Sequence, residues 1–226
     1  MKAFSEELVI NDFSLEVGDG EFVALLGPSG CGKSTLLNVL AGEERADSGT
    51  VFLESDPCLV FQRPSLFWWL TVEGNVAFPL KVRGMRKKEW RPRVRDLIAE
   101  VGLGGFERFY PHQLSGGMYQ RANLARALAT DKDILLMDEP LGALDVMTRF
   151  VMWRWLEQLW QAHHKTIVLV THQIEEAVVL ADRILVLNPR PTSIKQEIVV
   201  DIPRPRDAFS DECRALYQGI FVLLGM

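Results

Sequence analysis

The feature that most constrains this chain is the glycine-rich stretch at residues 27–34, Gly-Pro-Ser-Gly-Cys-Gly-Lys-Ser, which matches the P-loop pattern. The apolar run at residues 22–26 before it predicts a buried strand, and residues 33–41 after it predict a helix. A phosphate-binding loop requires this strand–loop–helix context. The sequence therefore predicts an α/β fold that binds a nucleotide.

The residue types of the P-loop suit a phosphate ligand. Its glycines let backbone N–H groups converge on phosphate oxygens, and the helix N-terminus adds its positive end. Lys33 supplies a point charge for the β and γ phosphates, and Ser34 is expected to ligate Mg²⁺. The expected nucleotide contacts are Gly27, Pro28, Ser29, Gly30, Cys31, Gly32, Lys33, Ser34 and Thr35. The predicted cofactors are a nucleoside triphosphate and Mg²⁺.

Two acidic residues follow a second apolar run, at residues 134–137, and so stand at the carboxyl end of a predicted strand. Open α/β sheets bind ligands at this end of their strands. Asp138 is expected to hold Mg²⁺ through water, and Glu139 to polarise the water that attacks the γ-phosphate. By themselves two acids could merely cap a strand turn, but after a P-loop they favour phosphoryl transfer.

Composition restricts the setting in which this chemistry takes place. The 226 residues are 48% apolar and suit one large domain, and the net charge of -5 disfavours nucleic acid as a partner. Three cysteines without paired spacing favour a reducing compartment. No apolar run is long enough to cross a bilayer, and the first seven residues lack the apolar region of a secretory signal. We therefore expect a cytoplasmic protein whose membrane role, if any, is docking.

Strands and helices alternate along the rest of the chain, which predicts a parallel sheet. Residues 13–17 predict a half-buried strand. Residues 72–101 predict helix, with Pro79 and Pro92 as interruptions or helix starts and Gly84 as a break. The other expected elements are a helix at 115–130, strands at 134–137, 167–170 and 183–187, helices at 146–162 and 174–181, an edge strand at 194–202 and a short C-terminal helix.

Residues 114–121, Leu-Ser-Gly-Gly-Met-Tyr-Gln-Arg, resemble the signature sequence of the ABC (ATP-binding cassette) family, and the resemblance runs over nearly the whole chain. Ser115 and the N–H groups of Gly116 and Gly117 stand at a predicted helix N-terminus, which makes a second anion site. The resemblance implies that this site meets the γ-phosphate on the P-loop of a second cassette. Two cassettes would then form a head-to-tail homodimer around two ATP molecules when ATP binds.

Four single residues also match family positions. The resemblance implies that Gln62 senses Mg²⁺ and the attacking water, and that His172 contacts the γ-phosphate and positions catalytic groups. It implies that Asp145 couples the two sites of the dimer. The spacing of Phe4 to the P-loop matches the aromatic ring that stacks on adenine, although an unattached N-terminal aromatic residue fits as well.

The implied fold is α/β: a P-loop NTPase of the ABC cassette type with a RecA-like α/β core, a small antiparallel β lobe and a helical lobe. We expect a single domain over residues 1–226, with the helical lobe at about residues 64–130 inserted in the core. Compared with the family, the chain begins just before Phe4 and residues 50–60 form a shorter stretch. The β lobe is therefore expected to be trimmed.

Three features resemble the nitrate, sulfonate and taurine importer subfamily: Met118, residues 66–72 and residues 200–206. The resemblance implies the ATP-hydrolysing subunit of an importer, peripheral on the cytoplasmic face of the inner membrane. Its partners would be a second cassette, transmembrane permease subunits and, indirectly, a periplasmic or extracellular solute-binding protein. Nothing in this chain would touch the solute.

Two other functions remain open. One is a soluble ABC ATPase that serves other machinery, such as iron–sulfur assembly. The other is a non-hydrolysing regulatory cassette, an idea that the trimmed β lobe prompts. The second is opposed by the intact set of Lys33, Gln62, Asp138, Glu139 and His172.

Two surface features have competing interpretations. The aromatic stretch at residues 67–72 resembles the segment that faces the transmembrane subunits, but a core patch between the lobes would also explain it. A basic cluster could bind nucleic acid or anionic lipid, but in an acidic chain it is interpreted as a solvated helix face. Its members are Arg83, Arg86, Lys87, Lys88, Arg91, Arg93 and Arg95.

Overall fold

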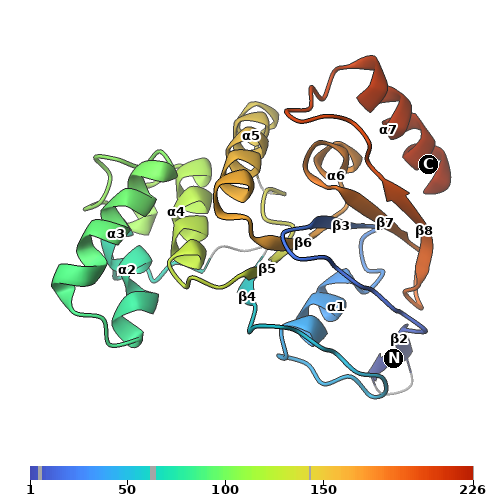
Figure 1. Cartoon of the computed structure of the whole chain (residues 1–226), viewed down its shortest axis with the longest axis horizontal. Coiled ribbons are helices and arrows are strands. Elements are labelled where there is room, and N and C mark those ends of the chain that lie inside the picture. The colour runs from blue at the N-terminus through green and yellow to red at the C-terminus, as the bar shows by residue number, and fades with distance from the viewer. Residues whose placement is uncertain (5–6, 62–64, 143, 226) are drawn as a thin grey trace. The chain divides into compact units, whose positions relative to one another are not determined.

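The computed structural model describes residues 1–4, 7–61, 65–142 and 144–225. Within them the chain forms two compact units, which Figure 1 shows by element. The α/β unit comprises residues 1–59, 133–139 and 156–226, and the helical unit comprises residues 60–132 and 140–155. Each unit therefore contains segments that are far apart in the sequence.

The α/β unit is built on a six-stranded sheet with the order β4-β5-β6-β3-β7-β8. Its strands are β3 (Phe22–Leu26), β4 (Cys58–Val60), β5 (Ile134–Asp138), β6 (Thr166–Thr171), β7 (Arg183–Leu187) and β8 (Ile194–Val199). β3 pairs in parallel with β6 and β7, and β5 pairs in parallel with β6. β8 runs antiparallel to β7 at the edge. The predicted parallel sheet and its edge strand are confirmed.

The central strands β3, β5, β6 and β7 are buried on both faces, as their uninterrupted apolar runs predict. Alternate side chains of β3, Val23 and Leu25, join one core cluster with Leu36 and Leu37 of α1 (Lys33–Leu40). The intervening side chains point the other way, where α6 (Ile174–Leu180) packs against β3. Figure 1 shows α1 and α6 on opposite faces of the sheet. Two further helices reach this unit: the end of α5 (Val146–His163), and α7 (Asp211–Leu223), which packs on α6.

The described part of the antiparallel β lobe consists of β1 (Lys2–Phe4) and β2 (Glu7–Ile10). The strand predicted at residues 13–17 is wrong, because this segment has no strand partner and is irregular. Its apolar side chains Phe13, Leu15 and Val17 nevertheless pack, partly buried, on the core cluster. The alternation of apolar residues thus arises because one side of an extended segment is buried, although the segment does not pair with a strand.

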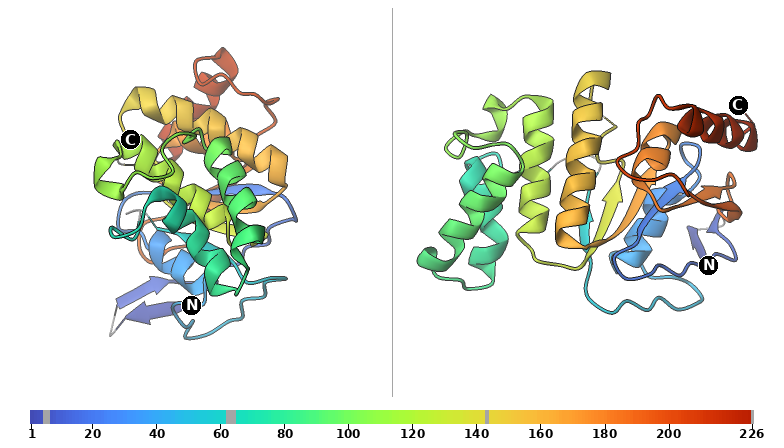
Figure 2. Two further views of the ribbon diagram at one scale, coloured as in Figure 1. Left: turned by 90° about the vertical axis from the view of Figure 1, so that its left-hand side faces the viewer. Right: turned by 45° about the horizontal axis from the view of Figure 1, so that its top comes forward.

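The helical unit contains α2 (Val72–Val82), α3 (Lys87–Glu100), the short 3-10 helix at Pro111–Gln113, α4 (Gly116–Leu128) and the beginning of α5. α2 packs on both α3 and α4, and Figure 2 shows the three as neighbouring helices. The predicted break at Gly84 is confirmed, with a left-handed φ of 76° that favours glycine. None of the helices, over the residues described, is long and apolar enough to span a bilayer.

The prediction that Pro79 and Pro92 interrupt or start helices is wrong, because both lie inside helices. Proline removes one intrahelical hydrogen bond and tends to kink a helix. One side of each helix is fully buried here, including Val76 and Leu80 around Pro79 and Val94 after Pro92. Burial of these side chains in the helical unit favours continued helix over the local preference of proline.

Candidate nucleotide site

The P-loop connects β3 to α1 and turns in the left-handed region at two glycines, Gly30 with a φ of 78° and Gly32 with a φ of 108°. Gly32 is the N-cap of α1. A Cβ atom at Gly32 would lie 2.5 Å from Thr192 Oγ1 and 2.9 Å from Val9 Cγ1. Both the backbone angle and the lack of space therefore require glycine there, and backbone N–H groups are brought close to where an anion can sit.

The ammonium group of Lys33 is buried inside this loop. The residue is only 5% exposed, and its ammonium group donates to the carbonyl oxygens of Gly27 at 2.8 Å and Pro28 at 2.9 Å. The Sγ of Cys31 lies 3.9 Å away. Pro28, Ser29 and Gly30 form an exposed rim, Ser34 is exposed and Thr35 is half-buried. The cation thus lies next to the exposed backbone that is expected to meet phosphate.

Thr192 holds the P-loop from a distant part of the chain. Its fully buried hydroxyl donates to the carbonyl of Cys31, and its backbone N–H donates to Val9 O at 2.7 Å. The N–H of Asn11 donates to Thr192 O at 3.1 Å. The loop is therefore tied to the end of β2. No motif in the sequence pointed to Thr192, which lies in the connection between β7 and β8.

Asp138 ends β5 and is under electrostatic strain. Burial raises the pKa of its carboxyl, a hydrogen bond from Ser34 opposes this, and the charge of Glu139 raises the pKa further. Ser34 is the last residue of the P-loop and lies in the first turn of α1. Its hydrogen bond to Asp138 therefore brings the P-loop into contact with the carboxyl end of β5. A hydroxyl and a carboxylate in contact form an oxygen-rich donor set, which hard cations such as Mg²⁺ prefer.

Glu139 follows the strand in a left-handed conformation, with a φ of 42°, which is uncommon for a residue with a side chain. Its N–H donates to Val170 O at 2.9 Å, so β6 holds the backbone in place. The Nδ1 of His172, just beyond β6, lies 3.0 Å from Glu139 Oε1. The Glu139 side chain is 15% exposed and that of His172 is 44% exposed. This pair can fix the orientation of the Glu139 carboxylate at the end of the strand.

The signature residues begin α4 in the helical unit. The Oγ of Ser115 accepts from Met118 N at 3.3 Å and caps the helix, while Ser115 and Gly116 are exposed. A Cβ at Gly117 would lie 2.8 Å from Thr148 Cγ2, so this glycine allows a close approach of α4 to α5. The helix start is therefore exposed, as the predicted second anion site requires.

Asp145 lies next to these residues through Thr148. Its carboxylate accepts from Thr148 N at 3.0 Å and from Thr148 Oγ1 at 2.6 Å. These two bonds lower the pKa of Asp145 and cap the start of α5. Thr148 therefore connects Asp145 with Gly117 inside the helical unit. Sequence reasoning missed Thr148, because a threonine near a helix start carries no specific signal.

The predicted residues fall into two groups. In the α/β unit the structure brings together the P-loop, Asp138, Glu139 and His172, whereas Ser115, Gly116, Gly117 and Asp145 belong to the helical unit. Phe4 lies on β1 and is 42% exposed, with the ammonium of Lys2 4.8 Å from its ring centroid. Gln62 lies outside the described residues.

A P-loop, an acid pair at a strand end and a signature helix occur together in this chain, and comparison with known proteins decides the family. The family model described as ABC transporter matches residues 10–142. The chain belongs to the ABC transporter family. The predicted fold class is confirmed as well, because this cassette resembles solved ABC cassettes with an α/β sheet and helices.

Relatives of the cassette match it over most of their length. An aliphatic sulfonates import ATP-binding protein of Pseudomonas savastanoi is 46% identical over 207 residues, covering 91% of this chain and 85% of that protein. A taurine import ATP-binding protein of Yersinia pestis is 42% identical over 215 residues, covering 92% and 84%. A solved dimeric ATP-binding cassette in a post-hydrolysis state with ADP and Pi aligns with a TM-score of 0.77 and 31% identity, covering 90% and 96%.

Proposed function

We propose that this cassette hydrolyses ATP as one of a pair and thereby drives solute import through transmembrane permease subunits. The observation that carries the proposal is the contact between the P-loop and the acid pair, with His172 placed on Glu139. The names of the relatives support a solute of the sulfonate or taurine kind. They favour an importer over a soluble ABC ATPase, and the intact acid pair disfavours a non-hydrolysing cassette.

Mg²⁺ fits the residues at the end of β5. Burial raises the pKa of the Asp138 carboxyl although the Ser34 hydrogen bond and the Lys33 charge lower it, so a bound cation would stabilise the charged carboxylate. Among the described residues, no group of three or more His, Cys, Asp and Glu side chains could hold a metal by itself. Ser34 and Asp138 would therefore hold Mg²⁺ together with phosphate oxygens of the nucleotide. The ion would neutralise charge on the β and γ phosphates during transfer.

The side chains of the α/β unit then have distinct tasks. Lys33 places its charge at the β and γ phosphates, where negative charge must be stabilised. Glu139 orients and polarises the attacking water, and His172 holds the Glu139 carboxylate in a single orientation. The left-handed backbone at Glu139 supports this role, because strained conformations are common where a side chain must be aimed.

A second cassette completes each nucleotide site in this proposal. Ser115 and Gly116 are exposed at the start of α4 and offer a helix N-terminus to the γ-phosphate bound by a partner. Asp145, held by Thr148 in the same unit, would transmit the state of one site to the other. The predicted adenine contact of Phe4 and the water contact of Gln62 belong to the same proposal.

The permease contact is assigned to the aromatic stretch at residues 67–72. Trp68 is 73% exposed and Trp69 is 55% exposed, which favours an interface over a core patch. Docking there would make the cassette peripheral on the cytoplasmic face of the membrane. A separate solute-binding protein would meet only the permease.

The Glu139→Gln variant tests the proposal. Phosphate release should fall by about 100-fold or more, because the water loses its base, while ATP binding persists. Light scattering in ATP and Mg²⁺ should then give the mass of a dimer. Glu16→Gln, the same chemical change at an exposed site, should keep wild-type activity. A Glu139→Gln protein that stays monomeric in ATP would contradict the paired mechanism.

A pull-down identifies the machinery. Tagged Glu139→Gln protein, held in ATP, is incubated with solubilised native membranes, and the captured proteins are identified by mass spectrometry. A multi-span permease is expected, and its identity narrows the solute. Capture of soluble partners alone, from a chain with measurable wild-type ATPase activity, would favour the soluble ATPase instead.

A further inference from the structure

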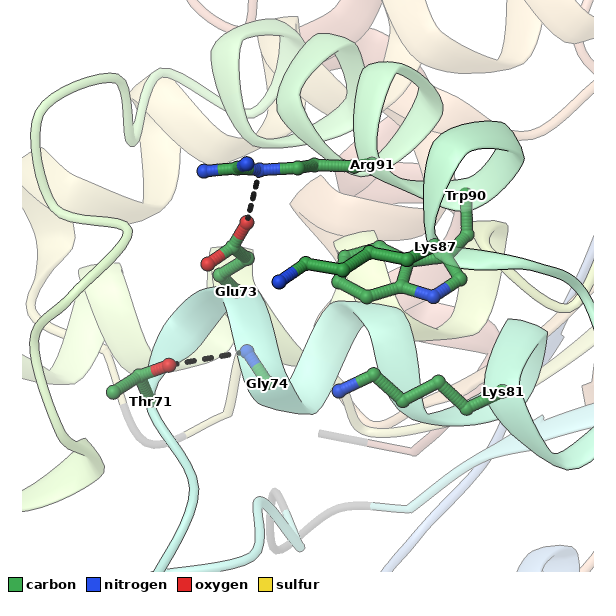
Figure 3. Close-up of a pocket in the computed structure, with 7 residues that line it drawn as sticks. All are labelled: Thr71, Glu73, Gly74, Lys81, Lys87, Trp90 and Arg91. Carbon is green, nitrogen blue, oxygen red and sulfur yellow. Dashed lines mark hydrogen bonds and ion pairs between the residues drawn. The ribbon is translucent and has the colours of Figure 1, made fainter.

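The helical unit contains a hollow of about 410 Å³ between the start of α2 and the first turns of α3. We call it the cationic hollow. Figure 3 shows its lining, which consists of Thr71, Glu73, Gly74, Lys81, Lys87, Trp90 and Arg91. None of these residues belongs to the proposed nucleotide site, so ATP hydrolysis gives the hollow no role.

Three cationic side chains converge on the cationic hollow. In Figure 3 the charged ends of Lys81, Lys87 and Arg91 extend toward the same side, around the single carboxylate of Glu73. The Nε of Arg91 lies 3.6 Å from Glu73 Oε1, and the ammonium of Lys81 lies 4.8 Å from the centroid of the buried Trp90 ring. One carboxylate is insufficient to neutralise three cations.

A second hollow, of about 990 Å³, shares Glu73, Lys87 and Arg91 with the first. It adds the cations Lys88, Arg95 and Arg108 and one further acid, Glu107. The Glu107 carboxylate accepts from Gly105 N at 3.0 Å, a bond that lowers its pKa and uses it within a turn. Six cations therefore line the two hollows with two acids, and Asp96 pairs with Arg95 at 3.7 Å, so a net positive charge remains in a chain whose net charge is -5.

The spacing of the cations along α3 does not favour the fold. Lys87, Arg91 and Arg95 follow one another at four-residue spacing on α3, and like charges at this spacing destabilise a helix. The Arg91–Glu73 pair is exposed, with 64% and 34% of the two side chains accessible, so it contributes little. The exposed cations of α3 agree with the solvated helix face that the sequence predicts, and their convergence on a hollow favours a ligand of opposite charge.

At the start of α2, side chains rather than backbone N–H groups are available to bind a ligand. The first three N–H groups of α2 are already bonded: Val72 to Phe109 O at 2.8 Å, Glu73 to Glu107 O at 2.9 Å and Gly74 to Thr71 Oγ1 at 3.1 Å. An anion must therefore be held by lysine and arginine. Arginine binds phosphate with two parallel hydrogen bonds, and lysine adds a point charge.

We propose that the cationic hollow binds a multiply charged, phosphate-bearing small molecule. Lys81 and Lys87 neutralise its charge, Arg91 binds its oxygens bidentately and Trp90 forms an apolar wall. Lys81 lies on α2 whereas Lys87 and Arg91 lie on α3, so the ligand joins the two helices. The concave shape favours a small molecule over a membrane surface. Binding at this hollow is independent of the proposed ATPase function.

The test uses inorganic pyrophosphate as the probe. It is carried out with the full chain in a Lys33→Ala background, because the P-loop is expected to bind the same anion. Calorimetry gives the affinity, and the indole N–H resonance of Trp90, assigned with Trp90→Phe, reports the position. Binding that moves this resonance and weakens with added salt is expected. Absence of binding, or binding that leaves the Trp90 resonance unmoved, overturns the proposal.

A double variant, Lys87→Gln with Arg91→Gln, should weaken pyrophosphate binding by about tenfold or more, because two charge-assisted contacts are lost. Both side chains are exposed, so the variant should fold. The matched control is Arg83→Gln with Lys195→Gln, which removes the same charge outside both hollows and should keep the affinity. Equal weakening in both double variants would show a non-specific charge effect and overturn the proposal.

Vesicles distinguish the source of the phosphate. Co-sedimentation with phosphatidylglycerol-containing vesicles is compared between the wild-type chain and the Lys87→Gln, Arg91→Gln double variant. Pyrophosphate binding with no vesicle binding that depends on these residues is expected. Vesicle binding that depends on them, without pyrophosphate binding, would assign the cluster to lipid head groups and overturn the small-molecule proposal.

Discussion

At the scale of single residues, Asp138 and Asp145 are placed in opposite electrostatic surroundings. Burial and the neighbouring Glu139 raise the pKa of Asp138, against a hydrogen bond from Ser34 and the charge of Lys33. The side chain and backbone of Thr148 donate to Asp145 and lower its pKa. The charged Asp138 carboxylate therefore lowers the free energy of unfolding, and the charged Asp145 carboxylate raises it. A residue that weakens the free protein beside a P-loop is consistent with a site built for a cation.

Replacing Asp138 with Asn should raise the melting temperature of the nucleotide-free protein near neutral pH. Because the folded-state pKa lies above the unfolded value, the unfolded state loses this proton first as the pH rises. The free energy of unfolding therefore falls as the pH rises from the unfolded-state pKa to the folded-state pKa of Asp138, and it stays lowered at higher pH. The advantage of Asp138→Asn should shrink as the pH falls toward the unfolded value near 3.8. Thermal unfolding from about pH 8 to about pH 4 measures this difference.

Asp145→Ala is the control of opposite sign. It should lower the melting temperature at neutral pH, because the cap on α5 is lost, and the difference should shrink as acid protonates the wild-type carboxyl.

An Asp138→Asn protein that melts below the wild type at neutral pH would show that Asp138 stabilises the free fold. The charged Asp138 carboxylate would then not oppose folding.

The sequence predicts those site residues that belong to a short local motif. Lys33, Asp138 and Glu139 are placed by a loop or a strand end that a few neighbours specify. The contact of His172 with Glu139 joins two strand ends that are neighbours in a parallel sheet, and this was foreseeable from topology. The supporting hydroxyls of Thr148 and Thr192 were not, since threonine is common and their partners are set by packing.

At the scale of elements, the aromatic stretch before α2 is held by one buried amide. Asn75 is fully buried, and its Nδ2 donates to the carbonyl oxygens of Phe67 and Leu70 at 3.1 Å and of Thr71 at 3.0 Å. Its Oδ1 accepts from Phe67 N at 2.7 Å. Asn75 thus ties the exposed Trp68 and Trp69 segment to the first turn of α2.

Asn75→Ala should destabilise the protein by about 3 kcal/mol, because several backbone groups would be left without partners. Urea denaturation measures the loss. Chymotrypsin should also cut faster at residues 67–70 under native conditions, because the segment loses its anchor. Asn11→Ala removes an exposed amide and should change neither quantity. Unchanged cleavage in a destabilised Asn75→Ala protein would show that other contacts hold the segment.

The elements that were mispredicted share one cause. Residues 13–17 have the alternation of a strand but no partner, and Pro79 and Pro92 lie in helices that burial sustains. Local pattern reports which side chains are buried, whereas hydrogen-bonded structure depends on neighbours supplied by distant segments. The strands around β3 were predicted correctly, because their apolar runs are buried on both sides and leave no other choice.

At the scale of the whole molecule, the two predicted anion sites belong to different compact units. The P-loop lies in the α/β unit, and Ser115 and its helix start lie in the helical unit. A head-to-tail pair would bring the P-loop of one copy to the signature helix of the other. Each nucleotide site would then require residues from both copies.

Mixing two inactive variants tests this arrangement. Lys33→Ala should lose ATP binding, because the phosphates lose their main cation, and Ser115→Arg should keep ATP binding but block the signature site. Each variant alone should be inactive in a phosphate-release assay. An equimolar mixture should regain activity, because a mixed dimer contains one site with an intact P-loop and an intact signature helix.

The control mixes Lys33→Ala with a Lys33→Ala, Ser115→Arg double variant. No intact site can form in that mixture, so no activity should return. If the Lys33→Ala and Ser115→Arg mixture also stays inactive while the two proteins form mixed dimers, then each site takes its residues from a single copy. The head-to-tail proposal would be refuted.

The sequence by itself determined the chemistry and the fold class of this protein. A P-loop after a buried strand, an acid pair after another and a signature before a helix are local patterns, and their residue types restrict which ligand they suit. Only the tertiary structure decided how these motifs are supported, because Thr192, Thr148 and Asn75 act on segments that the chain brings to them by packing. It also decided that the cations of α2 and α3 converge on one hollow, since charge counts are sequence properties but convergence is a matter of geometry.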